Sequence, residues 1–148
     1  MEADRPDPLA DGLDPILADQ DHAALVGLFV VGYLVARGGA FWHLTAMPAR
    51  DFAPVGLARL VGTPLAASTH HAIVVATALL ALAFAAGVLH RWLAPLFALG
   101  LTWVLGYRSS WGMLFHTDNL LVLHVAVLAL APAADAWSVD AWRRARAG

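Results

Sequence analysis

The sequence predicts an all-α integral membrane protein, a four-helix bundle whose short connections arrange the spans as an antiparallel series of hairpins. Two observations support this prediction. The 148 residues are 60% hydrophobic and only 14% charged, whereas a soluble domain carries about 25% charged residues. The apolar residues also form four long continuous stretches, and in lipid such stretches are helical because a helix satisfies its own backbone hydrogen bonds. This composition argues against a soluble enzyme and against a disordered chain.

The residue types that are missing exclude further classes of function. The chain has no cysteine, which removes disulfides, thiolate metal sites and cysteine nucleophiles. All nine basic residues are arginine, so a catalytic lysine is excluded as well. The formal net charge of −2 offers no basic surface, and we expect no nucleic-acid partner.

The first 21 residues differ from the rest of the chain. Residues 1–21 contain seven acidic side chains against the single Arg5, and three prolines interrupt them. A secretory signal would start with positive charge and continue into an apolar core, which this segment does not do. We expect an acidic N-terminal arm that lies in water.

A transmembrane domain is predicted over residues 22–134. A helix needs about 20 mostly apolar residues to cross the hydrocarbon core. The approximate spans are 23–45, 66–89, 92–107 and 113–131. Arg37, Gly38 and Gly39 interrupt the first span, where we expect a bend.

The distribution of arginine predicts the orientation. Residues 135–148 form a basic C-terminal tail that contains Arg143, Arg144 and Arg146. By the positive-inside rule this cluster places both termini in the cytoplasm, for a multi-pass protein of the cell membrane. Alanine and glycine are frequent in the spans and permit close helix approach, so the expected partners are the lipid bilayer and other membrane subunits or further copies of the chain.

Polar side chains near the third connection predict a ligand pocket. An ionisable residue in a span is costly, so each one needs a reason. Asp118 can pair with Arg108 across the turn, or with Arg37 on the first span, and a capped helix start is the simpler alternative. The predicted pocket comprises Arg108, Ser109, Ser110, His116, Asp118, Asn119 and His124.

The seven histidines raise a second hypothesis. Imidazole is the common axial ligand of haem, and two histidines from different helices can hold a b-type haem. His70 and His71 open the second span and match His116 in depth better than they match His124. A haem b site at His70 or His71 with His116 is therefore one prediction; hydrogen-bonded contacts between helices are the plainer alternative.

The C-terminal half resembles a known family. A serine-containing turn is followed by an early His and Asn and then by Pro-x-x-Asp-x-x-Ser-x-Asp, over residues 107–140. This pattern resembles the HTTM family, bacterial membrane proteins related to the membrane domain of the vitamin K-dependent γ-carboxylase. The resemblance implies a minimal four-helix version of that fold, although the lysine base of carboxylation is missing. The matching positions are Ser109, Ser110, His116, Asn119, Leu121, Pro132, Asp135, Ser138 and Asp140.

Three functions remain open at this point. The leading hypothesis is a ligand-binding or complex-forming membrane subunit without catalytic activity, because no known catalytic motif is present. The alternatives are an electron-transfer subunit that binds haem b or quinone, and a proton-linked transport element that uses His124 and Asp118. Four helices are few for a transporter, and no inverted repeat is visible.

Overall fold

The computed structural model describes residues 8–112, 116–130 and 146. Within these residues all regular structure is helical, which confirms the all-α prediction for this part of the chain. The predicted C-terminal tail lies outside it except for Arg146. The elements are α1 (Pro8–Ala36), α2 (Gly38–Leu44), two short 3-10 helices η1 (Ala49–Asp51) and η2 (Gly56–Leu60), α3 (Ala67–Ala85), α4 (His90–Ser109) and α5 (His116–Leu130).

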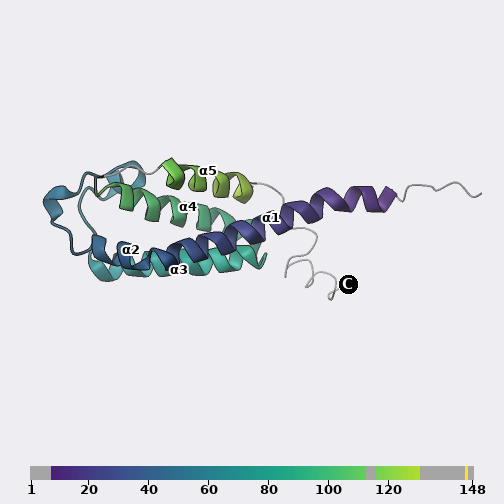
Figure 1. The fold of residues 1–148 in the computed structure, drawn as a ribbon, viewed down its shortest axis with the longest axis horizontal. Coiled ribbons are helices and arrows are strands. Elements are labelled where there is room, and N and C mark those ends of the chain that lie inside the picture. Colours follow the sequence, from purple (N-terminus) through teal and green to yellow (C-terminus); the bar gives the residue numbers. More distant parts are fainter. Residues whose placement is uncertain (1–7, 113–115, 131–145, 147–148) are drawn as a thin grey trace, which may run out of the picture.

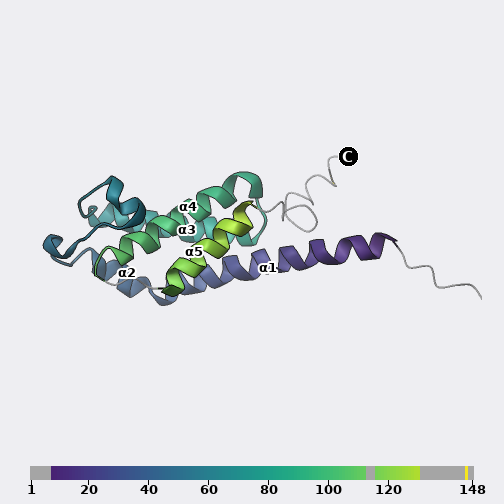
Figure 2. The same ribbon diagram turned by 90° about the horizontal axis from the view of Figure 1, so that it is seen from above.

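The long helices pack in sequence-neighbour order. α1 lies along α3, α3 along α4, and α4 along α5, while η2 packs against α4. Figures 1 and 2 show that the N-terminal half of α1 extends well beyond the other helices. Short connections make α3, α4 and α5 run alternately up and down, as in other hairpin-connected bundles.

The first helix is longer than expected and is bent. It begins at Pro8, inside the segment predicted as an acidic arm, and proline is well tolerated at a first helical position because its missing N–H needs no partner there. The interruption expected at Arg37 is present: the segments His22–Ala36 and Gly38–Leu44 are bent by 58°. Gly38 and Gly39 follow the bend, and glycine is a weak helix former.

A tight turn joins α3 to α4. Gly87 has a φ of 62°, in the left-handed region that glycine adopts without strain. Its N–H donates to the Phe84 carbonyl, and the Val88 N–H donates to the Ala83 carbonyl, both at 3.0 Å. This is a Schellman motif, which satisfies the last carbonyls of a helix and stops it. The turn therefore reverses the chain and sets α4 antiparallel to α3.

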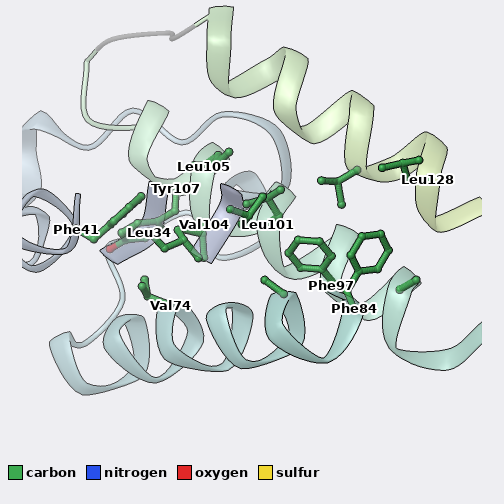
Figure 3. Close-up of a cluster of buried hydrophobic side chains, with 14 of the residues drawn as sticks. Leu34, Phe41, Val74, Phe84, Phe97, Leu101, Val104, Leu105, Tyr107 and Leu128 are labelled. Carbon is green, nitrogen blue, oxygen red and sulfur yellow. The ribbon is translucent and has the colours of Figure 1, made fainter. Parts of the chain in front are cut away.

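The core lies where α3 and α4 face α1 and α5. Phe84 and Phe97 are buried, with ring centroids 5.1 Å apart, and Figure 3 shows both rings between α3 and α4. Leu101, Val104 and Leu105 extend the core along α4. Thr77 is also buried, but its hydroxyl donates to the Ile73 carbonyl at 2.8 Å, so its polar atom has a partner.

Not every predicted span passes a test of length and apolarity. Among the described residues α3 alone is a single helix that is long and apolar enough to cross a membrane, and the bent pair of His22–Ala36 with Gly38–Leu44 passes when taken together. α5 is apolar but has 15 described residues. α4 has 20 residues, with Arg91, Pro95 and Arg108 among them. By length and composition, one or two helices of the described residues are thus candidate membrane spans.

Glycine sets the distance between α1 and α3. A Cβ atom added to Gly27 would lie 2.8 Å from the Ala85 Cβ and 2.9 Å from the Ala81 carbonyl oxygen. Real Cβ atoms do not approach so closely, and one of these contacts is backbone that cannot turn aside. The two helices therefore approach through small residues, as membrane helices commonly do.

Replacing Gly27 with alanine should destabilise the fold by about 1–3 kcal/mol, because the added methyl forces α1 away from α3. Gly32 on the same helix is the matched control, since a Cβ there meets no atom within 4 Å. Gly32→Ala should be neutral or stabilising by up to about 1 kcal/mol. Thermal unfolding in mild detergent, followed by circular dichroism, measures both; equal melting temperatures would show that α1 and α3 are not in close contact.

Candidate functional site

A buried ion pair joins α4 to α5. Arg108 lies in the last turn of α4 and Asp118 in the first turn of α5, where each charge suits the helix dipole. The Arg108 guanidinium donates to Asp118 Oδ2 at 2.9 Å, and the side chains are only 10% and 3% exposed. The structure therefore forms the Arg108–Asp118 pair, one of the two partners that the sequence left open for Asp118.

Tyr33 on α1 completes this cluster. Its hydroxyl donates to Asp118 Oδ1 at 2.6 Å and accepts a hydrogen bond from Arg108 at 2.7 Å. The Arg108 guanidinium also lies 6.0 Å from the centre of the Phe41 ring. Each charge thus has an opposite charge and a hydrogen-bonding hydroxyl beside it, which is what makes a buried ion pair tolerable. We call Tyr33, Arg108 and Asp118 the polar triad.

Arg37, the other candidate partner of Asp118, has a different environment. Its side chain is exposed, and its guanidinium lies 4.9 Å from the centre of the Tyr33 ring. A cation over an aromatic face is favourable by about 0.5–1 kcal/mol at an exposed site. Arg37 therefore covers the outer face of the tyrosine that contacts Asp118.

The two serines after Arg108 lie inside the protein. Both are buried. Ser110 anchors the long first loop: its hydroxyl accepts from the Val55 N–H at 3.1 Å and donates to the Gly106 carbonyl at 2.9 Å, while its own carbonyl accepts from the Ala53 N–H at 2.8 Å. Ser110 thus holds the loop against the C-terminal end of α4.

The remaining predicted pocket residues lie on a different face. His116, Asn119 and His124 are exposed on α5, whereas Asp118 points inward. The seven predicted residues therefore form an inner group with Arg108, Ser109, Ser110 and Asp118, and an outer group with His116, Asn119 and His124. In the inner group the two charges of Arg108 and Asp118 are paired with each other, and Ser110 is hydrogen-bonded to backbone groups.

His124 has a partner that the sequence did not suggest. Its Nε2 lies 2.7 Å from Nε2 of His22, 102 residues earlier on α1. This pair adjoins an open groove of about 660 Å³ lined by His22, Leu120, Leu123, His124, Val127 and Leu128. The groove has apolar walls and two imidazoles that can form hydrogen bonds with a ligand. We call it the α1–α5 groove.

The histidines at the start of α3 are packed against aromatic rings. His70 is fully buried and stacks on Tyr107 with centroids 4.5 Å apart. His71 stacks on Trp42 at 4.4 Å, with the planes only 8° apart. The His70 nitrogens form no hydrogen bond of ordinary geometry to the described residues. An unpartnered imidazole suits a metal ligand, but both His70 nitrogens and the His71 Nε2 are buried, so a macrocycle bound through them would have to displace the protein atoms that cover these nitrogens. The second predicted ligand, His116, is exposed on α5.

Sequence reasoning missed the roles of two side chains, Tyr33 and His22. Tyr33 lies one helical turn before Arg37, so the sequence indicates that the two residues share a polar face of α1. The sequence does not indicate which helix this face contacts. His22 lies next to the acidic arm, where a histidine needs no special partner. In both cases the missing information was a contact between α1 and α5, which lie more than 80 residues apart in the chain.

Comparisons with protein-family models, with curated proteins and with solved structures found no match. The resemblance to the HTTM family therefore stays a prediction. Of its matching positions, Pro132, Asp135, Ser138 and Asp140 lie outside the described residues.

Asp118→Asn should destabilise the protein by about 3–5 kcal/mol, because it removes the carboxylate charge that the buried Arg108 guanidinium contacts at 2.9 Å. Tyr33→Phe should cost less, about 1–3 kcal/mol, since one hydrogen-bonding group is lost while the ion pair stays. The double variant Arg108→Met with Asp118→Leu should recover much of the loss. Unfolding by denaturing detergent, titrated into protein held in mild detergent, ranks these variants. A double variant less stable than Asp118→Asn would contradict the triad as a paired, desolvated unit.

The purified protein should show no Soret band, because the His70 nitrogens and the His71 Nε2 that would bind the iron are buried against other protein atoms. Absorption spectra of the oxidised and dithionite-reduced protein in mild detergent test this. A Soret band with sharp reduced α and β bands, absent from the His70→Ala variant, would restore the haem hypothesis.

Proposed function

We propose that this chain is a multi-pass membrane protein of four spans that binds a small lipid-soluble ligand as a non-catalytic subunit. The observation that carries the membrane part is the outer surface of the bundle. Large apolar side chains are exposed on all four long helices, among them Leu28 on α1 (55% exposed), Leu79 on α3 (61%), Leu99 on α4 (57%) and Leu123 on α5 (62%).

Water is a poor solvent for such a surface. Soluble monomers rarely expose a contiguous apolar patch larger than a few hundred Å², whereas here each long helix adds exposed aliphatic residues to those of its neighbour. The described charged side chains with low exposure, Arg108 and Asp118, contact each other. An apolar exterior around a paired polar interior supports lipid as the surrounding medium.

The shorter helices are also compatible with spans. At 1.5 Å per residue, the 20 residues of α4 extend about 30 Å, which matches the hydrocarbon thickness. Its arginines and its histidine lie at its two ends, His90 and Arg91 in the first turn and Arg108 in the last. α5 begins with His116 and Asp118 and continues as an apolar helix. Hydropathy averaged over a window does not register this placement of polar residues at the ends.

Ligand binding is supported by the α1–α5 groove. Ligand sites in proteins are concave, mainly apolar and supplied with a few polar groups. The groove has four aliphatic side chains and two imidazoles. The polar triad, by contrast, is closed and structural, so we place the ligand at the outer group of residues rather than at Arg108.

The natural absence of cysteine allows a direct test of the topology, because one introduced cysteine is the only thiol. With four spans, Leu60 in η2 and Arg91 at the start of α4 lie on opposite sides of the membrane. Leu60→Cys and Arg91→Cys should therefore react with an impermeant maleimide from opposite faces of sealed vesicles, Arg91→Cys from the cytoplasmic face. Both variants should stay in the membrane after carbonate washing. Labelling of both from one face would contradict the four-span proposal.

A further inference from the structure

Polar contacts join α1 to α5. α5 packs mainly along α4 rather than along α1. Tyr33 contacts Asp118 at the start of α5, and His22 contacts His124 two turns further on. The apolar side chains that line the α1–α5 groove lie on both sides of this second contact, with Leu120 and Leu123 before His124 and Val127 and Leu128 after it. The groove therefore lies where the two helices are joined by polar contacts without being closely packed.

The geometry of the histidine pair is that of a hydrogen bond and not of a stack. The ring centroids are 5.0 Å apart, the planes are tilted by 44°, and the two Nε2 atoms are only 2.7 Å apart. The nitrogens therefore lie between the rings and face each other. A neutral imidazole has one N–H and one bare nitrogen, so one Nε2 donates and the other accepts. The pair thus offers one donor and one acceptor at a single point.

We propose that the α1–α5 groove binds a membrane-soluble amphiphile with an apolar chain and a hydroxyl head, and that the hydroxyl inserts between His22 and His124. A hydroxyl oxygen accepts from the donating imidazole while its hydrogen is donated to the other. Both nitrogens therefore keep a partner when the pair opens. An ether oxygen can only accept, which leaves one imidazole nitrogen without a donor in an apolar groove, at a penalty.

The walls of the groove select the rest of the ligand. Four aliphatic side chains of the groove follow one another along α5: Leu120, Leu123, Val127 and Leu128. In the proposed complex they contact the apolar chain of the ligand, which lies beside the helix. A volume of about 660 Å³ falls in the range of sites for small organic ligands. Leu120, Leu123 and Val127 are among the exposed residues, so a ligand can enter from the surrounding lipid. This inference rests on the proposed membrane location.

Two probes with nearly identical apolar chains distinguish the contribution of the hydroxyl to binding from that of the chain. The full-length protein in phosphatidylcholine nanodiscs is titrated with dodecanol and, separately, with methyl dodecyl ether, and the imidazole nitrogen NMR signals are recorded. The signals of His22 and His124, assigned by their loss in His22→Gln and His124→Gln, should move saturably with dodecanol and stay unchanged with the ether. The signal of His116, exposed on the same helix, should not move with either probe.

Variants provide the second measurement. His124→Phe should weaken dodecanol binding about tenfold, as expected for a lost hydrogen bond in an apolar site, whereas His116→Phe should bind as the unchanged protein does. Equal responses to alcohol and ether, or no response at His22 and His124, would overturn the hydroxyl site. The cysteine labelling of Leu60→Cys and Arg91→Cys is independent of this result, so failure of the ligand inference and failure of the membrane proposal are distinguishable.

Discussion

The contact of Arg108 with Asp118 and Tyr33 is the interaction on which the arrangement of the helices depends. The three side chains come from α4, α5 and α1, and removal of any one takes a hydrogen-bonding partner from the other two. In an apolar interior a lost hydrogen bond is far more costly than at a wet surface. The three helices must therefore be placed so that Tyr33, Arg108 and Asp118 contact one another. This placement determines which aliphatic residues of the helices can pack together.

The same constraint accounts for the groove between α1 and α5. α1 is fixed to α3 where Gly27 lets the backbones approach, and it is fixed to α5 by polar side chains that extend from both helices. Because α1 lies close to α3 on one side and contacts α5 only through long side chains on the other, space remains between α1 and α5. That space is apolar because α5 presents leucine and valine there, and polar at the point where His22 and His124 meet.

The sequence predicted elements whose cause is local. Long apolar runs ending at Gly87 and near Ser110 give α3 and α4, and Arg108 and Asp118 are near enough in the chain for their pairing to be considered. Contacts between distant helices could not be predicted, because periodicity shows which residues share a face but not which faces meet. Tyr33 with Asp118 and His22 with His124 belong to this class. His124, predicted as a pocket residue, is exposed because it lies on the same outer face of α5 as Leu120 and Leu123.

Lipid contact along the outer faces of all four long helices is the central claim, and accessibility of nitroxide labels in reconstituted protein tests it most directly. Labels are attached to Leu28→Cys, Leu79→Cys, Leu99→Cys and Leu123→Cys, with the buried Val125→Cys as the control. If the four helices face lipid, the four outer labels collide readily with oxygen, which concentrates in lipid, and rarely with a water-soluble nickel complex, while the control is shielded from both. Ready collision with the nickel complex on α4 and α5 would contradict the account, because those helices would then face water.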